Sequence, residues 1–404
     1  MDNIKETISL YDEDAYLSEF TARVLSCSPC SEREGLYEVI LDRTAFFPEE
    51  GGQEPDRGSL GQAAVVDVQI RSLEQPGGDI IVHYLDAPVE EGAEVEGRID
   101  FEHRFDQMQQ HSGEHIFSGI THSLYGYDNV GFSLSGNGVT MDFSGPLTDE
   151  QVLDIEHRVM EVICRNLEIE ISWPDKETLD KLEYRSKKEL TGRVRIVTIP
   201  GVDVCACCAP HVRRTGEIGF LKVVDRINYK GGCRVSIECG HRALKTMDHE
   251  HGLLKAIARD MSTGIDQIAD RLDKMSAEKA ELSARLSQLS VRLMEAKIGE
   301  IPDSQANVCL FEEGLDMKQM QTAVNMLVRK HSGYCCVFNR SGDDFKYVVG
   351  ISSGDAREAA AMLRDKFGAR GGGSALMIQG SMPLAKEADI IAAIDDLGGS
   401  RGIE

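Results

Sequence analysis

Two spacings constrain this chain more than any other feature of its sequence. His111 and His115 lie four residues apart in His-Ser-Gly-Glu-His, and Cys207 and His211 lie four residues apart in Cys-Cys-Ala-Pro-His. Side chains four apart on a helix project from one face, so a pair can direct two donor atoms to one point. Three imidazoles and one thiolate suit zinc. The two pairs together predict a metal site that brings together segments about ninety residues apart.

Several alternatives stay open for this site. Cys205 and Cys208 are alternative ligands, although neither keeps the four-residue spacing to His211. Four protein ligands would make a closed structural site, whereas an open position would permit catalysis. Helical geometry is expected to point Glu114 away from the ligand face, so it is not assigned as a general base. In the competing interpretation, one histidine lies in the core and the others are solvated, and no metal binds. This interpretation can account for the HxxxH pair alone, but it accounts poorly for HxxxH and CxxxH occurring together.

The charge distribution bears on the kind of partner. The net charge of −24 argues at first against nucleic acid. Residues 1–100 hold 23 acidic and 7 basic residues, a net charge of −16, whereas residues 181–242 hold 13 basic and 6 acidic residues, a net charge of +7. This basic stretch around Cys207 and His211 favours a polyanionic partner. The alternative is a solvated charged face.

Cysteine usage and hydropathy indicate the compartment. No apolar run reaches the length of a membrane span, and the first residues lack a basic segment followed by an apolar one. The sequence therefore predicts no membrane partner and no signal peptide. Eleven cysteines, three of them at 205, 207 and 208, fit metal binding or free thiols in a reducing cytoplasm better than a disulfide framework.

The pattern of elements predicts an α+β fold. Residues 1–95 read as short strands separated by Gly, Pro and Asp clusters, which is typical of a small β-barrel. Residues 96–245 mix strands with helices expected at 101–125, 148–166 and 175–190, and they include all four candidate zinc ligands.

Residues 246–300 are expected to form a helical linker. From Ile265 to Ala296, apolar residues recur at alternating spacings of three and four over more than four heptads, and Lys279 occupies one of these positions. We call this row of residues the seam. It predicts a coiled-coil arm and a homodimer, and the alternative is a long helix packed on its own domain.

Residues 301–404 are expected to form a last α/β unit. Its glycine-rich run lies at 368–380 and carries Arg370 and Ser374. Backbone N–H groups of such a run can cradle a phosphate or a nucleotide edge. The alternative is a flexible turn between a strand and a helix.

Three motifs in this order resemble the editing domain of alanyl-tRNA synthetase. They are FFPEEGGQEPDRG at 46–58, HSGEH at 111–115 and CCAPHVRRTGEIG at 207–219. The tail GARGGGSALMIQGS resembles the DHH-associated C-terminal domain of the same enzymes, and the seam matches their linker. The layout is similar to that of the freestanding alanyl-tRNA editing proteins, the AlaX family in its long form, so no aminoacylation domain is expected.

The resemblance implies a zinc-dependent ester hydrolase that removes serine or glycine from tRNA for alanine. It also implies the site residues: His111, His115, Cys207 and His211 as zinc ligands, with Thr44 and Gln53 near the aminoacyl group. A polar group there could select serine by its hydroxyl and leave alanine without a hydrogen bond, and Thr44 is the first candidate for it.

The chain departs from the family pattern at two places. Glu50 stands where the family often has a glycine, and Cys-Ala-Pro replaces the common Gly-Gly-Thr before His211. Both put the fine shape of the pocket, and thus the choice of serine or glycine, in doubt. Two other functions stay open: a tRNA-binding module with a structural zinc, and a zinc ester hydrolase acting on another aminoacyl-tRNA or on small molecules.

Overall fold

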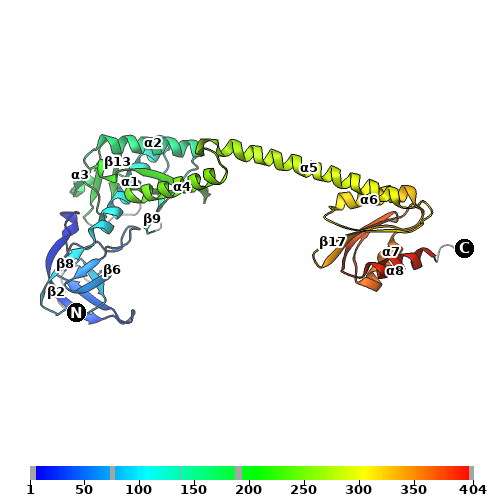
Figure 1. The fold of residues 1–404 in the computed structure, drawn as a ribbon. Helices are drawn as coiled ribbons and strands as arrows, with labels where there is room; N and C mark the ends of the chain where they lie inside the picture. Colours follow the sequence, from blue (N-terminus) through cyan, green and yellow to red (C-terminus); the bar gives the residue numbers. More distant parts are fainter. Residues whose placement is uncertain (1–5, 73–77, 137, 187–192, 400–404) are drawn as a thin grey trace. The chain divides into compact units, whose positions relative to one another are not determined.

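A computed structural model describes residues 6–72, 78–136, 138–186 and 193–399. Helices and sheets are mixed along the chain, in agreement with the predicted class (Figure 1). The chain divides into two compact units, Met1–Lys255 and Ala256–Glu404, and each is described by itself. The finer division at residues 95, 245 and 300 stays a prediction.

Six strands of the first unit close into a barrel in the order β2-β3-β7-β6-β5-β8. Along β2, exposed and buried residues alternate from Glu19 to Val24, as expected for a strand with one face in a core. The motif at 46–58, which we call the glycine-rich segment, begins with Phe46 and Phe47. Both are buried in the same core, so this segment is anchored on the barrel. The strands are β2 (Glu19–Pro29), β3 (Tyr37–Leu41), β5 (Gly58–Leu60), β6 (Ala63–Ser72), β7 (Asp79–Leu85) and β8 (Glu94–Ile99); outside the barrel, β1 (Ile8–Ser9) pairs with β4 (Arg43–Thr44).

Helix α1 (Phe101–Tyr125) follows the barrel directly and has the predicted bounds. The Asp100 side chain accepts the backbone N–H of His103, and Gly126 ends the helix in the left-handed region at φ 67°. Gly113 has a packing role, since a Cβ there would collide with Sγ of Cys239 on β15 (Gly232–Cys239). The helix therefore lies very close to this strand.

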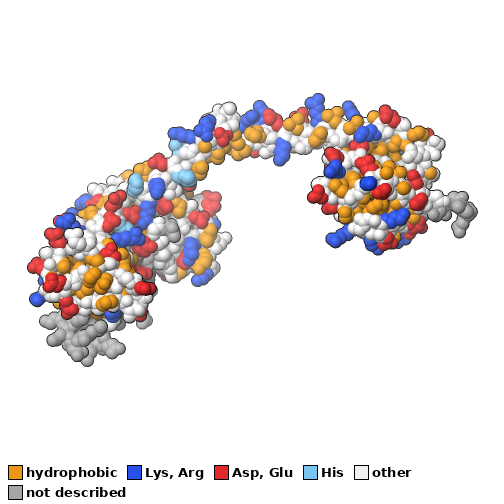
Figure 2. Space-filling view, turned by 60° about the horizontal axis from the view of Figure 1, so that its bottom comes forward, with side chains coloured by type: hydrophobic (Ala, Val, Ile, Leu, Met, Phe, Trp, Pro, Cys, Tyr) orange, Lys and Arg blue, Asp and Glu red, His pale blue; other side chains and the backbone are white. Residues whose placement is uncertain are grey.

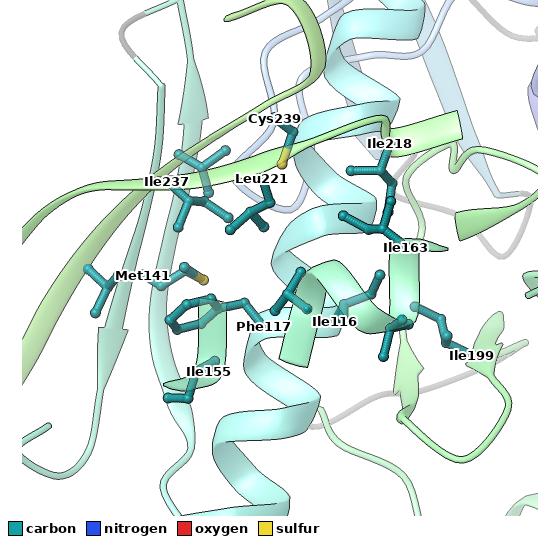
Figure 3. Close-up of a cluster of buried hydrophobic side chains, with 14 of the residues drawn as sticks. Ile116, Phe117, Met141, Ile155, Ile163, Ile199, Ile218, Leu221, Ile237 and Cys239 are labelled. Atoms are coloured by element: carbon teal, nitrogen blue, oxygen red, sulfur yellow. The ribbon is translucent and has the colours of Figure 1, made fainter. Parts of the chain in front are cut away.

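A second core surrounds α1. Its sheet has the order β14-β15-β10-β9, with β14 (Leu221–Tyr229), β10 (Gly138–Phe143) and β9 (Asn129–Ser135). Figure 3 shows side chains from α1, α2, β10 and β15 meeting in this core, among them Phe117, Met141, Ile155 and Ile237. Helix α2 (Asp149–Arg165) starts at a capping box of Thr148 and Gln151, close to the predicted 148–166.

A three-stranded antiparallel sheet carries the cysteine-rich segment. Its order is β11 (Glu170–Ser172), β12 (Ile196–Ile199) and β13 (Asp203–Ala206), and η2 (Thr215–Ile218) follows. The helix predicted at 175–190 is wrong for most of the described part of that range. Only α3 (Lys176–Leu179) forms there, because the backbone of Arg185 pairs with Val204 and Ala206 of β13 instead. Residues 187–190 lie outside the described residues.

The second unit is a five-stranded sheet with helices. The sheet has the order β16-β17-β18-β20-β19, in which only the β16–β17 pair is parallel. The glycine-rich run forms edge strand β19 and part of β20, so the alternative interpretation of this run as a flexible turn between a strand and a helix is wrong. A Cβ at Gly373 or Gly380 would collide with the neighbouring backbone, which explains the glycines. The elements are β16 (Val308–Glu313), α6 (Met317–Lys330), β17 (Cys335–Ser341), β18 (Asp344–Gly350), α7 (Arg357–Phe367), β19 (Arg370–Gly373), β20 (Met377–Pro383) and α8 (Glu387–Gly399).

The predicted linker is two helices, α4 (Gly240–Asp260) and α5 (Ile268–Glu300), with η3 (Ile265–Gln267) between them. Met294 and Ile298 of α5 are buried in the second unit, beside Leu327 of α6. The seam lies on another face of α5. Its leucines are exposed by 46% at Leu272 and by 54–67% at Leu282, Leu286, Leu289 and Leu293. Figure 2 shows hydrophobic side chains along this helix.

Among the described residues, no helix is long and apolar enough for a membrane span.

Candidate metal centre

The four predicted ligands lie together in the first unit. α1 supplies His111 and His115 from consecutive turns, and the loop after β13 supplies Cys207 and His211. One donor atom from each of the four residues lies within 4.8 Å of the others. Cys207 Sγ is 3.5 Å from His111 Nε2 and 3.4 Å from His211 Nε2. The three histidines are buried and Cys207 is partly exposed.

Each histidine is held through the nitrogen that faces away from the cluster. His111 Nδ1 donates to Oε1 of Gln53 at 2.7 Å, and His115 Nδ1 donates to Oδ2 of Asp203 at 2.8 Å. His211 Nδ1 lies 3.0 Å from Oγ of Ser112. Three Nε2 atoms are thereby left for the centre. Zinc–donor bonds of about 2.0–2.3 Å in a tetrahedron separate the donors by about 3.3–3.8 Å, so the observed Sγ–Nε2 distances fit a zinc ion.

The electrostatics of the cluster favour a thiolate at Cys207. Burial by itself raises the pKa of the Cys207 thiol, but the surrounding histidines, His111 foremost, hold that pKa well below its ordinary value. Burial lowers the pKa of His211 to about 3, so this imidazole is neutral. Burial also acts to lower the pKa of His115, but its hydrogen bonds with Asp203 and Cys207 raise it well above the ordinary value. A metal ion would therefore have to displace a proton from His115.

The alternative cysteine ligands are less suited to a metal. His115, Asp203 and Cys205 form a second close group, but Asp203 already accepts two hydrogen bonds from Arg185, at 2.7 and 2.8 Å. Burial raises the pKa of Cys205 to about 11, and burial also raises the pKa of Cys208. Both therefore stay protonated thiols, which are poor ligands. Cys207 is the better ligand among the three.

Gln53 reaches the centre from the glycine-rich segment. Its amide oxygen accepts from His111, and its Nε2 is buried without a hydrogen-bond partner among the described residues. The loop docks on β9, where the backbone N–H of Leu134 donates to the carbonyl of Gly52 at 2.7 Å. Buried Arg104 of α1 pairs with Asp56, three residues after Gln53, and so ties the loop to the helix that carries the histidines.

Thr44, a buried residue of β4, has its own set of hydrogen-bond partners. Its buried hydroxyl is 2.8 Å from Nε2 of His83 and accepts the backbone N–H of Phe46 at 3.1 Å. Because Nδ1 of His83 faces the carbonyl of Val39 at 3.2 Å, Nε2 is the acceptor for the Thr44 hydroxyl. Among the described residues, none of these hydrogen-bond partners is a candidate ligand. The structure thus places Thr44 where it fixes the start of the glycine-rich segment.

The expected direction of Glu114 is wrong. Its carboxylate is buried and accepts hydrogen bonds from Ser118 and Asn129, yet its second oxygen lies 3.9 Å from Nε2 of His115. Sequence periodicity did not indicate this approach.

A cavity of about 970 Å³ lies nearby against Asp203 and Cys205, and none of the four candidate ligands lines it.

Comparisons with known proteins bear on the family. A family model described as "Threonyl and Alanyl tRNA synthetase second additional domain" matches residues 194–236, and one described as "tRNA synthetases class II (A)" matches residues 15–103. Mouse "Alanyl-tRNA editing protein Aarsd1" is 31% identical over 281 residues, which are 66% of this chain and 67% of that protein. The chain belongs to the alanyl-tRNA editing protein family.

A second editing protein matches over a longer span. "Alanyl-tRNA editing protein AlaX-L" of Pyrococcus horikoshii is 26% identical over 403 residues, which are 96% of this chain and 98% of that protein. The C-Ala domain of Aquifex aeolicus alanyl-tRNA synthetase matches 22% of the chain with 18% identity and a TM-score of 0.21, too low to carry an argument. In this member of the family, the first matched domain contains Cys207 and His211, and the second contains Thr44 and Gln53.

Proposed function

We propose that the chain is a zinc-dependent aminoacyl-tRNA deacylase that removes serine or glycine from mischarged tRNA for alanine. One observation carries the proposal: three imidazoles and one thiol offer donor atoms within 4.8 Å of one another. The named activity of its relatives, alanyl-tRNA editing, supports the substrate class.

The residues present divide the chemical work. His111, His115, Cys207 and His211 would hold the ion, and a bound zinc would supply positive charge beside the ester carbonyl. The unpartnered Nε2 of Gln53 is available to donate a hydrogen bond to the aminoacyl group. Thr44 accepts the N–H of Phe46 and so helps to position the loop that carries Gln53. A hydrogen-bond donor such as Nε2 of Gln53 could pair with the hydroxyl of a seryl group. An alanyl group has no hydroxyl and would leave the buried donor unpaired, which disfavours alanine.

Positive side chains near the centre support a tRNA partner. Arg213 and Arg214 lie two and three residues after His211, and their side chains are 62% and 47% exposed. Exposed arginines that contact phosphates make binding depend on salt. Asp14 and Glu168 partly balance these charges, at 3.1 and 4.0 Å.

A tRNA-binding module with a structural zinc is the second candidate. Four protein donors is the ligand count of a closed structural site, and this count favours it. A zinc ester hydrolase that acts on another aminoacyl-tRNA or on small molecules is the third, and it shares the same centre.

One experiment separates the three functions. The purified chain is incubated with seryl-, glycyl- and alanyl-tRNA for alanine and with threonyl-tRNA, and release of the amino acid is followed. We expect hydrolysis of the seryl or glycyl ester and sparing of the alanyl ester. The proposal fails if tRNA binds and no ester is cleaved, or if another aminoacyl-tRNA is the better substrate.

We further propose that the chain forms a homodimer through the seam and works in the cytoplasm. The exposed leucines of α5 need a partner, and the face that α5 buries in its own unit is a different one. None of the eleven cysteines, all of them within the described residues, forms a disulfide, which supports a reducing compartment.

A further inference from the structure

The single tryptophan of the chain has no role in the proposed chemistry. Trp173 directly follows β11 and is half-buried. The guanidinium of Arg193 lies over the indole ring, 4.3 Å from its centroid, and Arg193 is exposed. An indole stacked with a planar cation on an exposed part of the sheet is a ready surface for a flat, electron-rich group.

This pair lies close to the candidate metal centre. Strand pairing puts Ser172 opposite Ile196, and Ile196 opposite Ala206. The next row across the sheet is therefore Trp173, Arg195 and Cys207, and the Cys207 N–H donates to the carbonyl of Arg195 at 3.1 Å. Two interstrand spacings of about 4.8 Å separate the backbones of Trp173 and Cys207 by roughly 10 Å.

The segment between them, just before β12, also holds the ligand loop in place. Arg195 donates through Nη1 to the carbonyl oxygens of Cys207 and Ala209, at 2.9 and 2.8 Å. Arg193 precedes Arg195 by two residues on the same segment. A group that stacks on the Trp173–Arg193 pair is thereby placed at a fixed distance from the centre.

We propose that Trp173 and Arg193 form a stacking surface for the unpaired 3′ end of the tRNA. The inference rests on the proposed function, in which the ester at the 3′ terminus enters the metal centre. The unpaired bases next to that ester must then pass within roughly 10 Å of it, and stacked nucleotides rise about 3.4 Å each. About three nucleotides would bridge the distance. Stacking on an aromatic ring is tolerant of sequence, and the arginine adds attraction for the phosphates.

The lone tryptophan makes this surface directly observable. Wild-type protein is titrated with a short single-stranded RNA that ends in CCA, and intrinsic fluorescence is recorded at low salt. Because all tryptophan emission comes from Trp173, stacking should change the emission in a saturable way. The same RNA with its 3′ end paired in a blunt duplex should leave the emission unchanged.

Variants separate stacking from charge. Binding of the same RNA, labelled at its 5′ end, is measured by anisotropy. Trp173→Ala should weaken binding roughly tenfold, the size expected for loss of one stacked base. Arg193→Lys keeps the charge but loses the planar group, and should fall between wild type and Arg193→Ala. Arg158→Ala is the matched control, since Arg158 is an exposed arginine of α2 paired with Asp154; it should bind like wild type.

The outcomes separate this inference from the proposed function. Saturable RNA binding with an unchanged emission, or equal affinities of wild type and Trp173→Ala, would overturn the stacking surface whether or not the protein deacylates tRNA. Undetectable binding of the CCA strand by wild type would overturn it as well. A saturable change in emission that the duplex lacks, in a protein without deacylase activity, would support the surface and overturn the proposed function.

Discussion

Gln53 accepts a hydrogen bond from Nδ1 of His111 across 2.7 Å, although 58 residues separate them in the chain. The contact joins the glycine-rich segment to the metal-bearing face of α1. It gives the glutamine a structural reason to be where it is, independent of any substrate. It also turns the second nitrogen of His111 toward Cys207, 3.5 Å away.

Changing Gln53→Ala should weaken metal binding. The substitution removes the acceptor that orients His111, and loss of such an outer partner typically lowers metal affinity about 10–100-fold. Competition with a chromogenic chelator measures the affinity. Gln62→Ala, at an exposed position of the barrel, is the control and should bind metal as wild type does. Equal affinities of wild type and Gln53→Ala would contradict the role of this hydrogen bond.

Metal content should follow the four ligands. We expect about one zinc per chain, lost together with deacylation in His111→Ala and in Cys207→Ala. Cys208→Ala and His122→Ala should keep the metal, because Cys208 is a protonated thiol and the His122 side chain is 48% exposed on the same helix. Elemental analysis and the deacylation assay check this. A metal-free, fully active protein would remove zinc from the proposal.

Thr44→Val should lower both stability and serine hydrolysis. The change leaves Nε2 of His83 and the N–H of Phe46 buried without their partner, which costs about 1–3 kcal/mol of unfolding free energy. Seryl-tRNA hydrolysis should fall by a factor of roughly 10–100 as the loop with Gln53 loses its position. Thr44→Ser keeps the hydroxyl and should recover both. Unchanged selectivity for serine over alanine in the valine variant would exclude Thr44 from discrimination.

Acid should destabilise the barrel through His83. Burial lowers the pKa of His83 to about 4 in the folded chain, below the ordinary value of 6.5, so the unfolded chain takes up the proton first. The neutral histidine thus contributes stability that is present above pH 6.5 and is lost as the pH falls toward 4. The loss is about 3 kcal/mol. Urea unfolding of wild type and His83→Gln at pH 7 and 4.5 measures the loss of unfolding free energy. An equal loss in both proteins would refute the assignment of the loss to His83. His122→Gln, at an exposed histidine, is the control and should behave as wild type does.

The seam should control the number of subunits. Leu282→Glu and Leu286→Glu together place charges in the exposed row of α5 and should convert a dimer into a monomer. Ala284→Glu changes the opposite side of the same helix and should leave the dimer intact. Sedimentation at several concentrations decides this. A wild-type monomer at all concentrations would disprove the coiled-coil arm.

Local signals in the sequence predict part of this structure. The predicted bounds of helix α1 agree with the structure, in which Asp100 caps its start and Gly126 ends it. The four-residue spacings of His111–His115 and Cys207–His211, together with the donor chemistry of these side chains, predict that the two pairs meet. The helix expected at 175–190 fails because a long-range pairing of Arg185 with β13 overrides local preference.

Contacts between distant segments explain the rest. The hydrogen bonds of Gln53, Asp203 and Ser112 with the three histidines could not be predicted from the sequence. In each pair the two residues are far apart in the chain. The approach of Glu114 to His115 likewise depends on Asn129, a residue of β9. For the glycine-rich run at 368–380, composition indicated that another group approaches the backbone closely. It did not indicate whether that group is a ligand or, as observed, a neighbouring strand.

The position of the four donors also bears on folding. His111 and Cys207 are 96 residues apart, so an ion held between them would act as a cross-link that closes a long loop of the chain. A cross-link of this kind ties the stability of the whole first unit to the free concentration of the ion. Each tenfold rise of that concentration above the dissociation constant adds about 1.4 kcal/mol to the unfolding free energy. Scarcity of the metal would then reduce the amount of folded protein as well as its activity.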